Sequence, residues 1–313
     1  MNLKLSASAI AFLAMTGAAS AGDLRPSIDD QGTEYFGNVF IGAGIETGRV
    51  PAVPSGVGID VQIPRVDFGG KFAFDPVDGS TGFQLDANGA YSDMGLALGT
   101  NTVSGSVIKG EAMAHITHGF NDHFKFGGFF GVESQNLTFN STTNPGLSRV
   151  LNADASTIGV EGLYVFSDQT WLQGHVGLVD MNYLSDVNTM KTPNFSSTVS
   201  DFFGAHLGYG AGASVNHTFN QNFGVRGDIA YTNFTANAVN TNFDILSTKA
   251  TLQYTMDTMP LTFAISAGHD STSWYTDGGG SYNGDLKIQW SFGGPSEGTR
   301  GKLFRTNVLG LTP

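Results

Sequence analysis

The sequence contains no cysteine among its 313 residues, and basic residues are scarce. Without cysteine there is no disulfide framework and no thiolate metal site, so the fold must depend on hydrogen-bonded secondary structure and packing. The 15 Lys and Arg residues stand against 27 Asp and Glu residues, for a net charge of −12. Such an acidic chain repels a phosphate backbone, which excludes a nucleic-acid-binding function.

Long apolar runs are also missing, since no stretch of 18 apolar residues occurs after residue 21. An α-helical membrane span needs about 20 such residues, so any bilayer crossing by this chain has to be made by strands. The mean hydropathy of −0.04 fits strands whose lipid-facing residues alternate with polar ones.

Residues 1–21 have the pattern of a secretory signal peptide. Lys4 provides a positive start, an apolar stretch follows, and Ala19-Ser20-Ala21 form a small-residue cleavage site. We expect the mature chain to begin near Gly22. The alternative, an uncleaved anchor, is disfavoured because the apolar stretch is too short to span a bilayer.

What the sequence does contain is glycine, aromatic residues and period-two alternation. Its 43 Gly and 24 Phe are typical of antiparallel barrels and propellers. Apolar and polar residues alternate clearly through residues 83–91 and 285–292, and helical periodicity is absent. The alternation predicts twelve strands, at 34–47, 58–75, 81–92, 104–118, 123–136, 154–166, 170–183, 201–218, 223–236, 242–256, 260–271 and 283–292.

The connections between these strands alternate between short and long. Short turns rich in Pro, Asn, Asp and Ser are expected at 76–80, 121–122, 167–169, 220–222 and 257–259. Long loops are expected at 48–57, 93–103, 137–153, 184–200, 237–241 and 272–282. Transmembrane barrels show this asymmetry, with tight periplasmic turns and longer extracellular loops. An even strand number places both ends of the chain on the tight-turn side.

Geometry decides which face of these strands meets lipid. About eight strands enclose an interior that side chains fill, whereas a ring of twelve is wider, so an apolar lining would leave a void. The apolar face must then point outward into an apolar solvent, and closure satisfies every backbone polar group. The rival architecture, a secreted propeller or sandwich, does not explain the loop rhythm.

Together, the signal sequence, the alternating strands, the tight turns and a last strand ending in Trp290-Ser291-Phe292 resemble Gram-negative outer-membrane β-barrel proteins. The resemblance is to the class and implies an all-β, antiparallel up-and-down barrel in the outer membrane. It divides the chain into a signal peptide (1–21), a short periplasmic segment (22–33), the barrel (34–292) and a C-terminal periplasmic tail (293–313). A class member of the autotransporter type would carry a long passenger before the barrel, which we do not expect here.

Aromatic residues next to the turns predict two interfacial girdles, because rings settle at headgroup level. The tight-turn girdle would comprise Phe74, Phe120, Phe166, Phe219, Trp290 and Phe292. The opposite girdle would comprise Tyr91, Phe130, Phe203 and Tyr231.

The polar face of the strands would line the lumen with charges of both signs. By parity, the candidate lining residues are Asp86, Lys109, Glu111, Lys125, Glu133, Glu161, His175, His206, Arg226, Asp228, Lys249, Asp285 and Lys287. One hypothesis is a narrow, hydrated passage for small hydrophilic solutes, favoured by an inward glycine row at Gly204, Gly208, Gly210 and Gly212. The alternative is that the charges pair into a lattice that closes the barrel, leaving a structural or adhesive protein acting through its loops.

An enzymatic function is a second alternative. Lumen-facing His115, His175 and His206 could meet a carboxylate such as Glu161 and act as a general base in an outer-membrane hydrolase. No Ser, His and acid set with recognisable spacing stands out, so we assign no catalytic residue and expect no enzyme. We also assign no cofactor or metal site, because His115, His118 and His123 straddle a predicted turn and would bind a metal only weakly.

The tail has the opposite charge to the rest of the chain. Arg300, Lys302 and Arg305 could reach into a negative lumen or touch a periplasmic partner, but the Gly293-Gly294-Pro295 start favours a disordered tail. The expected partners are outer-membrane lipid and lipopolysaccharide, the outer-membrane assembly machinery and, for a channel, small hydrophilic solutes.

Overall fold

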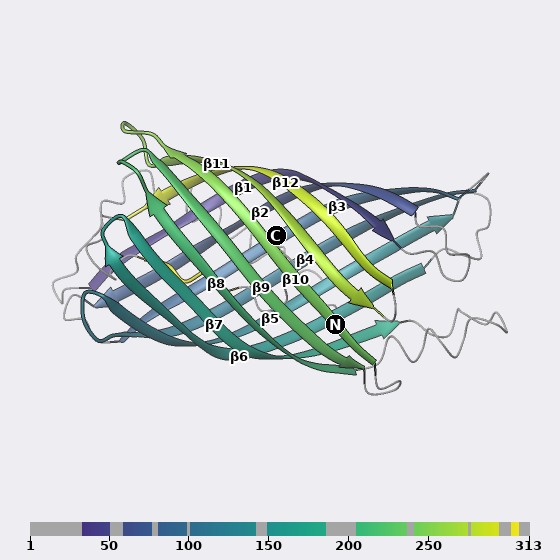
Figure 1. Ribbon diagram of the computed structural model, residues 1–313, viewed down its shortest axis with the longest axis horizontal. Helices are drawn as coiled ribbons and strands as arrows, with labels where there is room; N and C mark the ends of the chain where they lie inside the picture. Colours follow the sequence, from purple (N-terminus) through teal and green to yellow (C-terminus); the bar gives the residue numbers. More distant parts are fainter. Residues whose placement is uncertain are drawn as a thin grey trace.

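The computed structural model describes residues 33–50, 59–76, 81–98, 101–141, 149–185, 205–236, 241–274, 277–293 and 302–306. These residues form twelve strands that close into one barrel (Figure 1). The strands are β1 (Thr33–Val50), β2 (Ile59–Pro76), β3 (Thr81–Leu98), β4 (Asn101–Gly119), β5 (Phe124–Ser141), β6 (Arg149–Ser167), β7 (Thr170–Ser185), β8 (Ala205–Thr218), β9 (Phe223–Ala236), β10 (Thr241–Thr255), β11 (Leu261–Trp274) and β12 (Asp277–Phe292).

Every strand pairs with its sequence neighbours in the antiparallel sense. The ring closes where β12 pairs with β1, from Gly37 opposite Phe292 to Gly48 opposite Ser281. Closure leaves no strand edge, so the backbone N–H and C=O groups of the wall find partners within the sheet. The prediction of an all-β, twelve-stranded up-and-down barrel is confirmed. Among the described residues, no helix is long and apolar enough to cross a membrane.

The strands extend further than predicted at the long-loop end of the barrel. β3 continues to Leu98 and β12 begins at Asp277, so most of the predicted loops 93–103 and 272–282 are paired strand. The predicted strands ended where the apolar alternation ended. That rule failed because hairpin pairing depends on backbone hydrogen bonds, which continue beyond the part of the wall that needs an apolar face.

Two tight turns share one construction. In the turn between β4 and β5, Asn121 Oδ1 accepts hydrogen bonds from the backbone N–H groups of His123 and Phe124, both at 2.8 Å. In the turn between β8 and β9, Asn220 Oδ1 accepts from Asn222 at 2.9 Å and Phe223 at 2.8 Å. An asparagine side chain that binds the backbone two residues ahead replaces a main-chain turn contact, which explains how so few residues reverse the chain.

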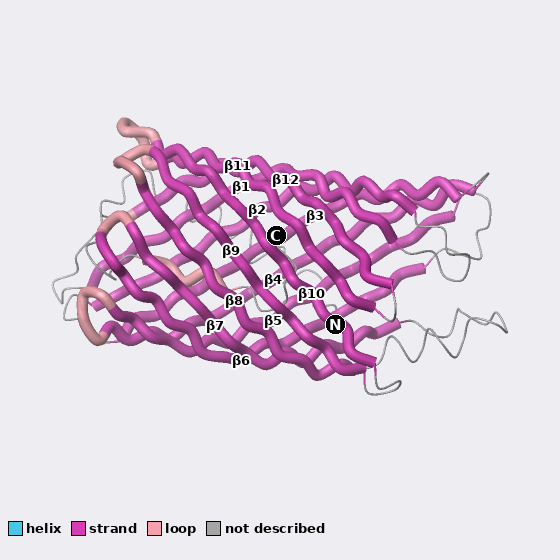
Figure 2. Tube along the Cα trace, in the orientation of Figure 1, coloured by secondary structure: helices cyan, strands magenta, loops and turns pink. Residues whose placement is uncertain are grey.

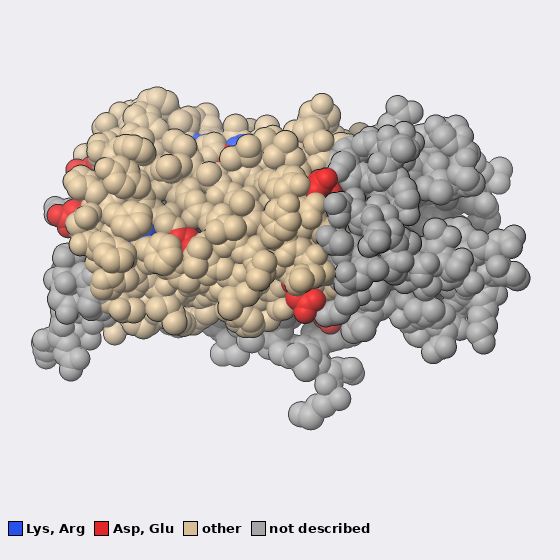
Figure 3. Space-filling model, turned by 60° about the horizontal axis from the view of Figure 1, so that its bottom comes forward, with Lys and Arg blue, Asp and Glu red and all other residues tan. Residues whose placement is uncertain are grey.

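The outer surface of the barrel is apolar. Large side chains such as Ile116, Ile158, Leu178 and Ile265 are about 60% exposed and point away from the lumen. On the face seen in Figure 3, the described wall carries very few charged atoms, and most of those lie near its two ends. An exposed apolar band of this extent requires a lipid environment, because soluble monomers do not present such a surface to water.

We expect Asn220→Ala to destabilise the barrel by about 1 to 2 kcal/mol, because it removes the acceptor of two hydrogen bonds. Asn220→Asp keeps an acceptor oxygen and should remain close to wild type. Urea titration of the protein in lipid vesicles gives the free energy of unfolding, and equal values for the two variants would refute the role of the turn.

A charge on the outer wall should cost more. Ile158→Lys places an ammonium group on the lipid-facing surface, where we expect a loss of about 2 to 4 kcal/mol in the same titration. Ile158→Val serves as the control. A negligible effect of the lysine would mean that this surface does not face lipid.

Candidate functional site: the barrel lumen and the C-terminal segment inside it

The lumen is lined by charged side chains that pair with one another. Asp285 on β12 accepts from Arg65 at 2.6 Å and from Lys249 at 2.8 Å. Lys109 on β4 pairs with Glu133 at 3.1 Å. The charges of the wall therefore face the lumen and hold one another in place.

The structure turns the described lumen candidates inward as their parity indicated. Asp86 pairs with Lys71, Glu161 with His115 and Arg226 with Asp228. Lys125 lies over the ring of Phe304, and the side chain of His206 lies outside the described part of the structure. A single cavity contacts the remaining candidates Glu111, His175 and Lys287 as well as Arg226, Asp228 and Lys249.

Sequence reasoning missed the charges of β2. Arg65 Nε lies 2.9 Å from Asp67 Oδ1, and Lys71 binds Asp86, so this strand supplies three groups to the lumen network. The sequence does contain the alternating pattern. Arg65, Asp67 and Lys71 are two or four positions apart, and their neighbours Pro64, Val66 and Phe72 are apolar. The two glycines at 69 and 70 obscured the pattern.

Residues 302–306 of the C-terminal tail lie inside the barrel. Figure 2 shows them as a short coil within the wall, towards the end that carries the tight turns. Phe304 is 1% exposed and packs with Leu163, Val165 and Trp171. The expectation of a disordered tail is therefore wrong for these residues, and of the two alternatives the structure has the lumenal one.

Polar contacts fix this segment in register. The Phe304 N–H donates to Gln84 Oε1 at 2.9 Å, and Gln84 Nε2 donates back to the Phe304 carbonyl at 2.9 Å. The Arg305 N–H donates to Gln173 Oε1 at 3.0 Å, and the Thr306 hydroxyl donates to Glu161. Side chains of the wall thus satisfy the backbone of an irregular segment that has no sheet partner.

Gly293 begins the tail, directly after β12. Its φ of +98° lies in the left-handed region, and a Cβ there would collide with Phe36 and Tyr35 of β1. Only glycine adopts this conformation without strain, so the chain leaves β12 through a turn that a side chain would obstruct. The Gly293-Gly294-Pro295 start, which suggested disorder, includes a residue with a defined conformation.

The lumen also contains apolar side chains. Met113, Phe129, Val179, Met181, Phe234 and Ile245 form one buried cluster. Rings cover part of the glycine row as well, since Phe234 lies over Gly208 and His175 over Gly212. Gly204 lies outside the described residues. The glycines therefore leave less open space than the sequence suggested, because neighbouring rings fill the positions that they vacate.

Two groups of histidines were candidates for chemistry, and the structure places them in different surroundings. His115 Nδ1 lies 2.8 Å from Glu161, which is the contact that the enzymatic alternative required. However, His115 is 0% exposed, and the ring of Phe304 stacks on it at 6.4 Å between centroids. His118 and His123 lie elsewhere, against Phe120 and Tyr164, so the three do not meet.

The predicted girdle residues of the tight-turn end lie on the outer wall. Phe120, Phe166 and Phe219 are 59–61% exposed there, and Trp290 is 40% exposed. Phe74 and Phe292 are half-buried by ring contacts with Phe83 and Phe72.

The opposite girdle is less regular. Tyr91 is exposed ten residues above the start of β3, and Tyr231 hydrogen-bonds Asp244 at 2.6 Å. Phe130 is only six residues above the start of β5, fewer than the roughly nine to eleven that cross a bilayer, so it sits near mid-wall. Phe203 and the predicted signal peptide lie outside the described residues.

Solved structures share this fold. The translocator domain of the autotransporter NalP from Neisseria meningitidis matches with a TM-score of 0.50 at 12% identity, covering 91% of this chain and 98% of that one. The transport unit of the autotransporter AIDA-I from Escherichia coli matches with a TM-score of 0.51 at 13% identity, covering 90% and 97%. The β domain of the Bordetella autotransporter Brka gives 0.53 at 8% identity, covering 82% and 99%.

The fold is that of Gram-negative outer-membrane β-barrels. These neighbours confirm the class-level resemblance and support an outer-membrane location, in agreement with the apolar outer wall. At such low identity they show the fold alone, so the similarity to translocator domains does not make this chain one. No protein-family model matches the sequence, and no curated protein does either.

The packing of Phe304 predicts how the tail can be released. Phe304→Ala removes a fully buried ring, which typically costs about 3 to 5 kcal/mol, so the segment should leave the lumen much more often. Trypsin, which cuts after Lys302 and Arg305, should then cleave the tail while the barrel stays intact, as followed by mass spectrometry. Phe304→Leu keeps most of the apolar contact and should stay protected; equal protection of wild type and the alanine variant would count against a docked tail.

Proposed function

We propose that the protein is a narrow passive channel for small hydrophilic solutes in the outer membrane, and that its own C-terminal segment restricts the passage. The observation that carries this proposal is the way in which residues 302–306, which plug the lumen, are held there. Residues 302–306 occupy the lumen near the tight-turn end, and nearly all of their polar contacts are to side chains of the wall.

Those wall groups are ones that water also satisfies. Gln84, Gln173, Glu161 and Lys71 would each regain hydrogen bonds from water if the segment left, so its departure does not strand buried polar atoms. A cavity of about 180 Å³ lies next to the segment, contacts Arg305 and Thr306, and continues the polar lining. Withdrawal of the tail would join this cavity to the space that the tail now fills.

A closed structural barrel is the second candidate, and the buried apolar cluster that includes Met113 and Ile245 favours it. Side chains of the wall itself would then obstruct the lumen whether or not the tail is present. Catalysis is not part of either proposal, because Phe304 and Thr306 cover the His115–Glu161 pair.

Planar-bilayer recording separates these candidates. The full-length protein should show small or infrequent conductance steps, and deletion of residues 294–313 should produce larger and longer-lived ones, because the segment no longer occupies the lumen. Heat-modifiable migration on a gel checks that the deletion variant is folded, and Phe304→Ala tests the same idea in the whole chain. If neither variant conducts, the channel proposal fails and the closed barrel stands; if wild type and both variants conduct equally, the plug is wrong.

A further inference from the structure

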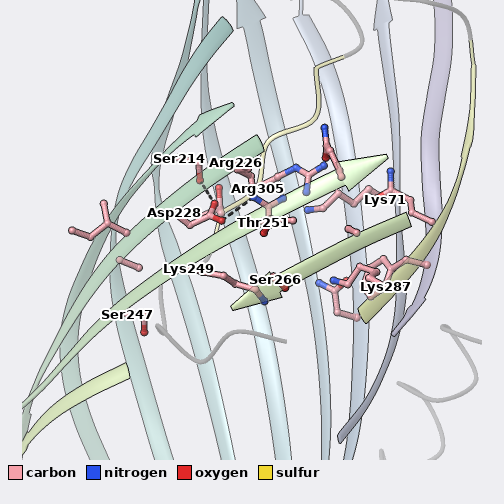
Figure 4. A pocket seen from close by; sticks show the side chains of 18 of the residues that line it. Lys71, Ser214, Arg226, Asp228, Ser247, Lys249, Thr251, Ser266, Lys287 and Arg305 are labelled. Carbon is pink, nitrogen blue, oxygen red and sulfur yellow. Dashed lines mark hydrogen bonds and ion pairs between the residues drawn. The ribbon is translucent and has the colours of Figure 1, made fainter. Parts of the chain in front are cut away.

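Among the charged residues that line the cavity beside the tail, cations predominate. Lys71, Arg226, Lys249, Lys287 and Arg305 contact it, against the two carboxylates Glu111 and Asp228. The basic side chains come from β2, β9, β10, β12 and the tail, and Figure 4 shows them around the same space. This local excess runs against the net charge of −12 of the whole chain. The lumen is therefore not uniformly acidic, and the charged groups around this cavity have the opposite net sign.

Three of these cations already have carboxylate partners. Lys71 pairs with Asp86, Lys249 with Asp285 and Arg226 with Asp228, the last at 2.8 Å. Asp228 also accepts from Ser214 at 2.6 Å. Asp285 is shared with Arg65, so one negative charge serves two positive ones.

Lys287 and Arg305 differ from the other three. Within the ranges that the structure describes, no carboxylate forms an ion pair with either of them. Lys287 Nζ lies 4.0 Å from the centroid of the Phe40 ring, and Arg305 donates a hydrogen bond to Gln173 through its backbone N–H. Asp67 attracts Lys287 and Asp228 attracts Arg305 only over longer distances. Two partly buried cations without a direct ion-pair partner are unfavourable, and an anion between them would supply one.

A neutral donor lies in the same cavity. Thr251 on β10 is 7% exposed, contacts the cavity, and has a buried hydroxyl oxygen with no hydrogen-bond partner among the described residues. A buried polar atom without a partner is uncommon and calls for an explanation. A ligand oxygen would supply one, because the hydroxyl could donate to it.

We propose that this cavity binds a small oxyanion, a molecule carrying carboxylate, phosphate or sulfate groups, between Lys287 and Arg305 with Thr251 as a further donor. Guanidinium and ammonium groups form their strongest hydrogen bonds with such oxygens. Drug-sized ligands occupy pockets of about 300 to 1,000 Å³, so a cavity of about 180 Å³ suits a smaller solute. The inference that such an anion is the transported solute rests on the proposed channel function. The inference that the cavity binds an anion does not depend on it.

The tail thereby has two roles, since it narrows the lumen and supplies Arg305 to the site. Anion binding and tail docking should therefore support each other, because an anion held by both Lys287 and Arg305 links the wall to the segment. A saturating anion should protect the tail further against trypsin.

The experiment is calorimetric titration of citrate and of inorganic phosphate into the full-length protein in a neutral detergent at low ionic strength. Wild type should bind at least one of them. Lys287→Gln, Arg305→Gln and Thr251→Val should each weaken the affinity, the two charge changes by about tenfold or more. Lys109→Gln is the matched control, because Lys109 faces the lumen, pairs with Glu133 and does not line this cavity, so its affinity should equal that of wild type.

Absence of binding to both probes, or binding that Lys287→Gln leaves unchanged, would overturn the site. Binding of the polycation spermidine instead, through Glu111 and Asp228, would also overturn it. Bilayer recording keeps the two proposals apart: anion binding without conductance would refute the channel alone, whereas conductance without anion binding would refute the site alone.

Discussion

The pairing of β12 with β1 is the constraint on which the rest of the molecule depends. It turns twelve strands into a ring in which no backbone donor or acceptor faces lipid from an open edge. Once the ring closes, its outside has to be apolar and its inside has to be filled by something other than lipid. The exposed Ile, Leu and Phe side chains, the lumenal charges and the enclosed tail all follow from that division.

Three kinds of group occupy the interior of the barrel. Ion pairs such as Lys109–Glu133, on neighbouring strands, place long polar side chains on the inner face of the wall. The cluster around Phe129 and Phe234 packs an apolar block against several strands. Residues 302–306 add a segment of the same chain to the interior, which is tethered at Gly293 and therefore present at a high effective concentration. Modest contacts are enough to hold a tethered segment, and they also allow it to leave.

The distribution of charge inside the barrel separates two environments. Near the tight-turn end, carboxylates and amides bind the tail, as Glu161 and Gln84 do. Lys287 of the wall and Arg305 of the tail face the neighbouring cavity, and neither forms an ion pair among the described residues. Acidic and amide side chains hold the segment, whereas Lys287 and Arg305 keep their charges without an ion pair. The charge of the cavity is therefore complementary to an anion.

Local pattern determined the wall of this protein. A strand with one face in lipid must alternate with period two, so the strand number, the closed topology, the tight turns at Asn121 and Asn220, and the inward direction of residues such as Asp86 and Lys249 were predictable from the sequence. Only the strand ends towards the long loops were misplaced, because hairpin hydrogen bonds do not require an apolar face.

Tertiary structure decided what the lumen contains. Alternation shows that Lys287 and Glu161 point inward but not which group each one meets across the ring, and a five-residue segment without periodicity carries no local signal that it docks inside. Those contacts join residues up to 233 positions apart, as in the hydrogen bond between Lys71 and the Phe304 carbonyl, and only closure of the barrel brings them together.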